Sequence, residues 1–185
     1  AAQMWAIGSR STMISRRHRL NSKYEMALIA QVKLSEQEHE VMVCAEAKTA
    51  DSLIGFLGND LQGDILEVGA GSGSFSRSIS GVASRLVSVE PNDKFHKELN
   101  QKLLGVENAE SFLGTLSDYV ARTKEHNAER KFDRVMYTHV LEHITDDVSE
   151  LRLAKDQLHP DGKAIVVVPS MPRLYGSVDS LAGHV

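Results

Sequence analysis

The stretch ILEVGAGSGSFS, residues 65–76, decides the fold of this 185-residue chain. Apolar residues and one acid lead into glycines at alternate positions, Gly69, Gly71 and Gly73, and a Ser/Phe pattern follows. This order predicts a strand, a tight turn and the start of a helix, where backbone N–H groups can receive a polar or anionic ligand. Glycine suits such a turn because a ligand approaches the backbone closely and because a positive φ is tolerated there. The dinucleotide fingerprint G-x-G-x-x-G would need a glycine at position 74, where the chain has Ser74.

The composition predicts one globular domain without a nucleic-acid-binding surface on its main body. With 42% hydrophobic and 25% charged residues, the chain has room for one ordinary domain. Residues 1–24 hold five of the 21 Lys and Arg residues and no acid, so residues 25–185 carry 16 bases against 25 acids, a net charge of −9. Backbone phosphates require a basic face, so we expect no nucleic-acid partner. No apolar run approaches the roughly 20 residues of a membrane-spanning helix, so no membrane span is expected.

The basic beginning of the chain, residues 1–34, is expected to be a disordered or helical extension of the domain. Its first 24 residues are rich in Arg and Ser and free of acids, a composition typical of a mitochondrial transit peptide. A disordered terminus or a wrongly assigned start is the plainer interpretation. Cys44 is the only cysteine, so no internal disulfide can form and a reducing compartment is expected. We therefore expect a cytoplasmic protein, with mitochondrial targeting as the alternative.

From residue 35 to 185 the pattern predicts one α/β domain. Ser35 and Glu38 fit a capping box, which predicts a helix from residue 35 to about 57. Strands separated by helices predict a Rossmann-like, doubly wound and mostly parallel sheet. Five strands are expected, at residues 64–69, 85–90, 109–113, 132–138 and 164–168. Helices are expected after the glycine turn and near residues 92–104, 115–127 and 145–157, and a turn at residues 159–162.

Two motifs resemble those of a known enzyme family. The pattern E-x-G-x-G-x-G, from Glu67 to Gly73, resembles motif I of the class I S-adenosylmethionine (SAM) methyltransferases. The strand FDRV at residues 132–135, followed by HVLEHI at 139–144, looks like the segment after the fourth strand in small-molecule methyltransferases of the ubiquinone/menaquinone and type-11/12 groups. The resemblance covers about residues 40–185 and implies SAM-dependent methyl transfer to a small molecule. Class I members typically have seven strands, so we expect this chain to lack the last two and to be incomplete at its C-terminus.

The resemblance implies a cofactor site at the carboxyl ends of the strands. Glu67 would help to hold the methionine end of SAM; the alternative is a solvent-exposed acid at a strand end. Glu90, 17 residues beyond Gly73, can accept both ribose hydroxyls, as it could in an NAD enzyme, and argues against the 2′-phosphate of NADP. Thr115 lies near the adenine position, where many members have Asp, and Asp118 is expected to belong to the following helix. The expected cofactor-binding residues are Glu67, Gly69, Ala70, Gly71, Gly73, Glu90, Pro91, Thr115, Thr138 and His139.

His139 is the candidate catalytic residue, since a histidine can take a proton near neutral pH. The alternative is that His139 only packs against the cofactor. The spacing of His139 and His143 could suggest a metal pair, but no third ligand is evident, so no metal is expected. The Asn/Asp-Pro-Pro-aromatic tetrapeptide of nucleic-acid amino-methyltransferases is absent from the sequence, and an oxygen acceptor is mildly favoured. Two other functions stay open: an NAD-dependent oxidoreductase, and a non-catalytic SAM-binding remnant.

Overall fold

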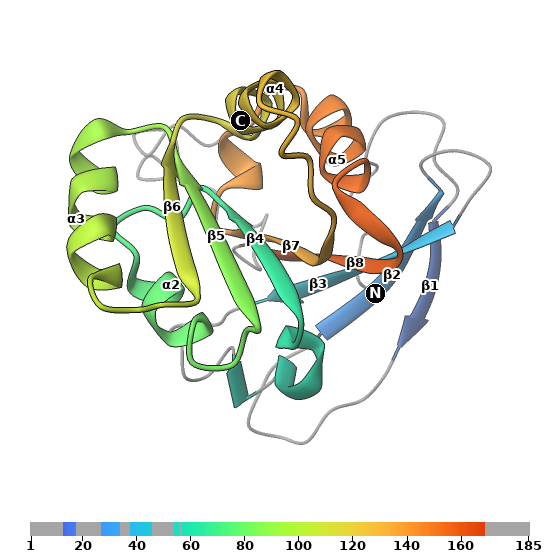
Figure 1. Cartoon of the computed structure of the whole chain (residues 1–185). Coiled ribbons are helices and arrows are strands. Elements are labelled where there is room, and N and C mark those ends of the chain that lie inside the picture. Colours follow the sequence, from blue (N-terminus) through green and yellow to red (C-terminus); the bar gives the residue numbers. More distant parts are fainter. Residues whose placement is uncertain (1–12, 18–26, 34–37, 46–53, 56, 169–185) are drawn as a thin grey trace, which may run out of the picture.

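A parallel five-stranded sheet forms the centre of the computed structural model, which describes residues 13–17, 27–33, 38–45, 54, 55 and 57–168 (Figure 1). The strands are β4 (Asp64–Val68), β5 (Arg85–Glu90), β6 (Ala109–Leu113), β7 (Phe132–Thr138) and β8 (Leu158–Val168). They pair parallel in the order β8-β7-β4-β5-β6. The predicted Rossmann-like sheet of five strands is confirmed.

Two apolar cores, one on each face of the sheet, hold most of the helical elements, as a doubly wound fold requires. The helical elements are η1 (Gly58–Leu61), α2 (Ser74–Ile79), α3 (Asp93–Leu103), α4 (Leu116–Glu125), η2 (Leu141–His143) and α5 (Asp147–Lys155). Successive strand residues point to opposite faces. Leu66 therefore packs with α4 and α5, whereas Ile65 packs with η1 and α2.

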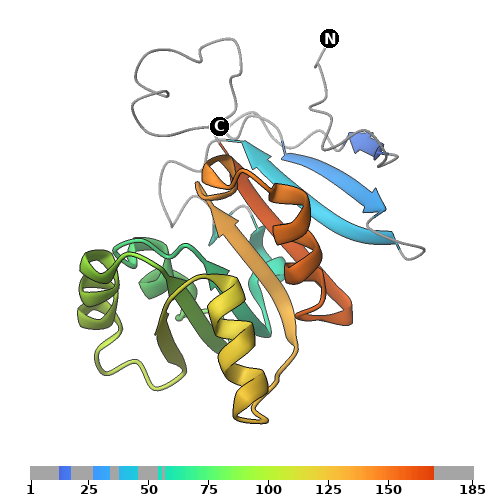
Figure 2. The same ribbon diagram turned by 90° about the horizontal axis from the view of Figure 1, so that it is seen from above.

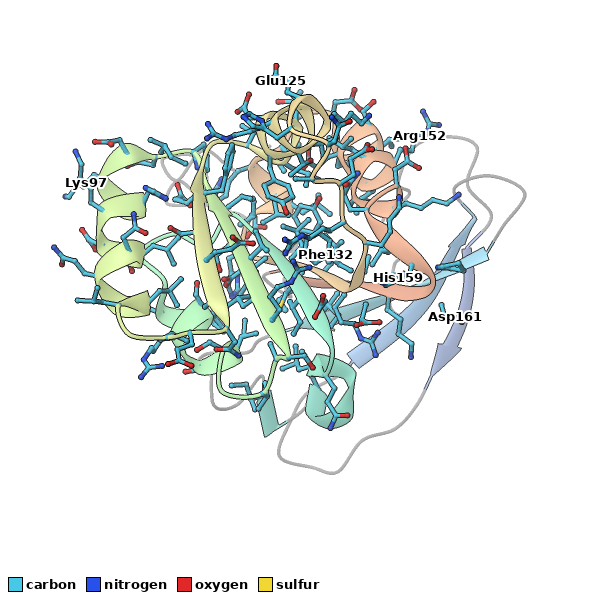
Figure 3. All side chains as sticks on the ribbon, viewed as in Figure 1. Lys97, Glu125, Phe132, Arg152, His159 and Asp161 are labelled. Carbon is cyan, nitrogen blue, oxygen red and sulfur yellow. The ribbon has the colours of Figure 1, made fainter. Side chains whose placement is uncertain are left out.

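The helices turn their charged residues away from these cores. Lys97 of α3, Glu125 of α4 and Arg152 of α5 lie on the outside of the molecule, whereas Phe132 of β7 lies in its interior (Figure 3). None of the described helices is both long and apolar enough to cross a membrane.

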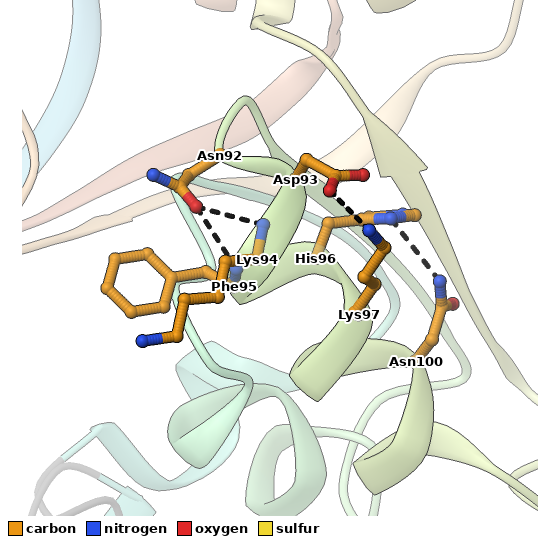
Figure 4. A network of polar contacts seen from close by, with 7 residues as sticks. All are labelled: Asn92, Asp93, Lys94, Phe95, His96, Lys97 and Asn100. Carbon is orange, nitrogen blue, oxygen red and sulfur yellow. Dashed lines mark hydrogen bonds and ion pairs between the residues drawn. The ribbon is translucent and has the colours of Figure 1, made fainter.

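Helix α3 begins at a side-chain cap and lies against the edge strand β6. Asn92 Oδ1 accepts hydrogen bonds from the backbone N–H groups of Lys94 and Phe95, at 3.0 and 3.2 Å (Figure 4). Such a cap satisfies donors that the first turn of a helix leaves unpaired. The hydroxyl of Ser111 in β6 lies 3.1 Å from His96 Nε2 of α3, which joins the two elements.

Three further strands extend the sheet beyond β8, and α3 lies at the opposite end of the sheet (Figure 2). β1 (Met13–Arg17), β2 (Ala27–Lys33) and β3 (Glu38–Ala45) pair antiparallel with one another, and β3 pairs parallel with β8. The predicted helix from residue 35 is therefore wrong over β3, and the disordered or helical extension is wrong over β1 and β2. Residues 18–26, 34–37 and 46–53 lie outside the described chain, as do residues 169–185 with the predictions made for them.

The physical reason for this correction is non-local pairing. The capping box at Ser35 and Glu38 is a local signal, whereas the run from Val41 to Ala45 pairs with the apolar residues 164–168 of β8. Valines favour a pleated, packed surface, and β8 offers an edge whose backbone groups need partners. The capping box spans only four residues, so it cannot show that residues 41–45 have a partner in the open edge of β8.

The turn predicted at residues 159–162 is also corrected, because these residues belong to β8. Phe132 pairs with Leu158 and Arg134 with Lys163, so two steps along β7 match five steps along β8, and the extra residues form a bulge. A Cβ atom on Gly162 would lie 3.0 Å from the carbonyl oxygen of Phe132. Glycine lets the bulged strand approach β7 this closely.

Candidate functional site

The glycine turn joins β4 to α2 at the carboxyl ends of the strands. Gly69, Gly71 and Gly73 have φ values of 71°, 55° and 78°, which confirms the predicted need for positive φ. The N–H groups of Gly69 and Ala70 donate to the carbonyl of Val89 in β5, at 2.9 and 3.0 Å. The N–H of Gly73 donates to the carbonyl of Ala70 at 3.0 Å. These N–H groups of the turn are therefore used inside the protein. The N–H groups at the start of α2, from Ser74 onward, stay the predicted place for a polar or anionic ligand.

The three glycines differ in what surrounds them. A Cβ atom on Gly69 would lie 2.4 Å from Val140 Cγ2, and one on Gly73 would lie 2.7 Å from Leu99 Cδ1. A Cβ atom on Gly71 would meet nothing within 4 Å. Protein packing therefore requires glycine at the first and third positions, and the open space at Gly71 lets a ligand approach the backbone.

Glu90 ends β5 and holds the glycine turn. It is only 5% exposed. Its Oε2 accepts from the N–H of Gly71 and its Oε1 accepts from the N–H of Asn92, both at 2.8 Å. Each carboxylate oxygen has a second lone pair, so Glu90 can also accept from the hydroxyls of a bound ribose. Pro91 follows it and is exposed.

Glu67 lies inside the protein and not at an exposed strand end, so that alternative is wrong. Its side chain is 1% exposed, and its Oε2 accepts from the hydroxyls of Ser76 at 2.6 Å and Ser88 at 2.7 Å. Its Oε1 is buried without a hydrogen-bond partner. Burial raises the pKa of Glu67 to about 7, although the two hydroxyls act to lower it.

The segment after β7 forms the second part of the site. Thr138 Oγ1 is buried without a hydrogen-bond partner. The N–H of His139 donates to the carbonyl of Val167 in β8 at 2.8 Å, and His139 has a φ of 55°. A positive φ is uncommon for a residue other than glycine and is found at functional sites. Val140, the next residue, contacts the glycine turn at Gly69.

Glu142 is a member of the site that the sequence reasoning missed. Its side chain is 13% exposed, its Oε1 lies 3.8 Å from His139 Nδ1, and neither carboxylate oxygen has a hydrogen-bond partner. Burial raises the pKa of Glu142, but His139, the backbone N–H of Glu142 itself and His143 together outweigh burial, so the pKa lies below its usual value. The signal was the HVLEHI motif, where an acid follows His139 at a distance of three residues.

Thr115 caps α4 after the third parallel strand. Its hydroxyl donates to Asp118 Oδ2 at 2.7 Å and accepts from the N–H of Asp118 at 3.2 Å. The hydroxyl and the backbone N–H of Thr115 both donate to the carboxylate of Asp118 and lower its pKa, and Asp118 belongs to α4 as predicted. The contact of Thr115 with adenine stays a prediction.

The arrangement fits a polar ligand that crosses several strand ends. Among the described residues, five buried side-chain nitrogen and oxygen atoms lack a hydrogen-bond partner, and four of these belong to Glu67, Thr138 and Glu142. Glu67 lies on β4, Thr138 ends the neighbouring strand β7, and Glu142 lies in η2 just after it. Buried polar groups normally find partners, so these atoms indicate a place for hydrogen-bonding ligand groups. In the described part of the chain, no three His, Cys, Asp or Glu side chains gather as metal ligands.

Residues 43–183 match the family model described as "Methyltransferase domain". The match spans most of the chain, which therefore belongs to the methyltransferase domain family. No curated protein matches the chain.

Solved structures of methyltransferases share the fold. DhpI in complex with SAH is 26% identical, with a TM-score of 0.52 over 64% of this chain and 55% of that chain. SAM-bound CalS10, an amino pentose methyltransferase from Micromonospora echinaspora, is 12% identical, with a TM-score of 0.56 over 68% of this chain and 53% of that chain. The O-methyltransferase from Bacillus cereus in complex with SAH is 16% identical, with a TM-score of 0.50 over 62% of this chain and 53% of that chain. This chain thus spans about half the length of these proteins, and their bound SAM and SAH support the predicted cofactor.

Proposed function

We propose that this chain binds SAM across the carboxyl ends of β4, β5, β6 and β7 and transfers its methyl group to a small-molecule acceptor. The observation that carries the proposal is the fixed turn: Glu90 holds the N–H of Gly71 at 2.8 Å, beside the open space above that glycine. A nucleoside bound there would contact the backbone of Gly71, which has no side chain, and the carboxylate of Glu90 beside it. Pro91 lies next to that carboxylate.

The predicted polar residues then contact different parts of SAM. Glu90 accepts from the ribose hydroxyls, and the unpartnered Oε1 of Glu67 faces the methionine end, directly or through water. Thr115 lies toward adenine. Thr138 and His139 line the sulfonium side, where Thr138 Oγ1 supplies another buried oxygen without a partner.

Methyl transfer from SAM needs no covalent bond between the substrate and a protein side chain. When bound, SAM supplies a methyl group already activated on a sulfonium, so the residues of the chain align the acceptor and exclude water. Val140 lies against Gly69, so the segment that faces the acceptor is packed directly on the turn that faces the cofactor. This contact fixes the two halves of the site relative to each other.

A small-molecule acceptor with a reactive oxygen is the proposed substrate. The absence of the Asn/Asp-Pro-Pro-aromatic tetrapeptide from the sequence supports a small molecule over a nucleic-acid base. One structural neighbour, CalS10, is a methyltransferase of an amino pentose, which is itself a small molecule, and another neighbour is an O-methyltransferase.

Isothermal titration calorimetry with SAM, SAH and NADH tests the cofactor, and methyl transfer from labelled SAM to a metabolite extract tests the reaction. We expect micromolar binding of SAM and SAH, no response to NADH, and a labelled small molecule. Binding of NADH alone would identify an oxidoreductase and overturn the proposal. Binding of SAM without transfer would instead support a non-catalytic SAM-binding protein.

A further inference from the structure

The carboxylate of Glu142 occupies an unusual place in the site. Both of its oxygens are buried, and neither has a hydrogen-bond partner in the part of the chain that the structure describes. Burying a carboxylate without donors is costly, so natural proteins keep such a group where it acts on a neighbour or a ligand. The imidazole of His139 lies beside this carboxylate, with Nδ1 3.8 Å from Glu142 Oε1.

The distance suits an ion pair that tightens when a proton arrives. At 3.8 Å the two atoms are within ion-pair range but beyond a normal hydrogen bond. Catalytic hydrogen bonds are often longer before the substrate binds and shorten in the reactive complex. A carboxylate beside Nδ1 favours the tautomer with its hydrogen on Nδ1, which leaves Nε2 as the basic nitrogen, and it stabilises the imidazolium.

The backbone directs this pair toward the reacting groups. His139 is the first residue after β7, held by its N–H bond to Val167 and turned by its positive φ. The next side chain, Val140, contacts the glycine turn. His139 itself is 40% exposed, so its ring can meet an acceptor and return a proton to solvent.

We propose that Glu142 is a positioning residue that orients His139, and that His139 Nε2 takes the proton of the methyl acceptor. The inference rests on the proposed function. As the acceptor oxygen or nitrogen bonds to the methyl carbon and the carbon–sulfur bond breaks, the proton of the acceptor passes to Nε2. Glu142 balances the charge of the imidazolium, which later releases the proton to water.

Among the described residues, one more histidine and three uncharged residues lie beside the pair. His143, in the same turn, is the second histidine that lowers the pKa of Glu142. On the side of β8 the neighbouring residue is Val167, and on the side of the glycine turn the contact is through Val140 to Gly69. Val167, Val140 and Gly69 carry no charged side chain, so His143 is the other titratable group named beside the pair.

The test is an NMR titration of the His139 imidazole in the cofactor-free protein, comparing wild type with Glu142→Gln. Removing the carboxylate charge should lower the pKa of His139 by about one unit, because an opposite charge at this distance favours the charged imidazole. The control Glu129→Gln changes an exposed acid at the opposite end of β7 and should leave that pKa unchanged. An unchanged His139 pKa in Glu142→Gln overturns the pairing.

A second measurement stands if Glu142→Gln does not fold. Nitrogen-15 shifts of wild-type His139 above its pKa should show the Nδ1–H tautomer, and the Nε2–H tautomer would overturn the proposal. Where transfer to the extract is measured, Glu142→Gln should reduce it about tenfold and move its acidic limb to lower pH, whereas Glu142→Asp should restore part of both. If wild type fails to bind SAM while the His139 pKa still shifts, the pairing stands and the proposed function fails.

Discussion

Gly69→Ala tests the contact that joins the two halves of the site. The new Cβ atom would lie 2.4 Å from Val140 Cγ2 and 2.7 Å from Val140 Cγ1, far inside van der Waals contact. The alanine would also have to adopt a φ of 71°, which costs about 1–2 kcal/mol. Overpacking adds about 1–3 kcal/mol. We therefore expect Gly69→Ala to lower the free energy of unfolding by about 2–5 kcal/mol.

Gly71→Ala is the matched control, because its φ of 55° gives a similar strain while no atom lies within 4 Å of the new Cβ. It should cost only about 1–2 kcal/mol of stability. Its methyl group would fill the space proposed for the ligand, so SAM affinity should fall about tenfold or more. Urea unfolding followed by circular dichroism measures stability, and calorimetry measures affinity.

Val140→Ala supplies the decisive comparison, because it removes both Cγ atoms that the new methyl would strike. In that background the new methyl still lies 3.1 Å from the Cβ of residue 140, which needs only a small shift, so Gly69→Ala should cost little more than the backbone strain of about 1–2 kcal/mol. Equal destabilisation by Gly69→Ala and Gly71→Ala, or no relief from Val140→Ala, would refute the packing argument.

Three further changes probe the buried polar groups. Burial raises the pKa of Glu67 from 4.5 to about 7, so the native state binds more protons than the unfolded chain between these pH values. The free energy of unfolding, relative to that of Glu67→Gln, should therefore fall by about 3 kcal/mol as the pH rises from 4.5 to 7. Urea unfolding measures this difference, and the same pH dependence in both proteins would refute the reasoning. Glu90→Gln should weaken SAM binding by about 10- to 100-fold in calorimetry, since charge-assisted hydrogen bonds contribute about 1.5–3 kcal/mol. Tyr137→Phe removes the hydroxyl that donates to Glu150 Oε1 at 3.1 Å, so it should lower the free energy of unfolding by about 1–2 kcal/mol and leave SAM affinity unchanged. A loss of SAM binding energy as large as the loss of stability would contradict a purely structural role.

The sequence predicts the central sheet well because its signals are local. Residues 132–138 and 109–113 become strands with the predicted bounds, and Asn92 and Thr115 cap their helices. The register of each strand is set by its apolar residues, which must alternate between two covered faces. Strand β3 could not be predicted in this way, because its partner in β8 lies more than a hundred residues away along the chain.

In the candidate site, too, the sequence predicts what local signals determine and misses what depends on non-local contacts. The spacing of Glu67, Glu90 and the glycines is enough to predict that these residues belong to one cofactor site. What spacing does not reveal is which groups satisfy one another: Glu90 bonds the N–H of Gly71, and Ser76 and Ser88 bond Glu67. Glu142 was missed because a glutamate within a helical turn is usually solvated, and only the packed structure shows that its oxygens are buried.

Glu67 and Glu142 show how one side-chain type takes two roles in a single site. Neutral hydroxyls surround Glu67, so burial dominates, and a pKa of about 7 makes it partly protonated near neutral pH. Histidines lie beside Glu142, and they lower its pKa despite burial, so it stays ionised. Environments that separate the pKa values of two carboxyl groups also separate their chemistry. Negative charge is therefore kept beside His139, where a proton acceptor needs it, while Glu67 can both donate and accept a hydrogen bond at the cofactor side.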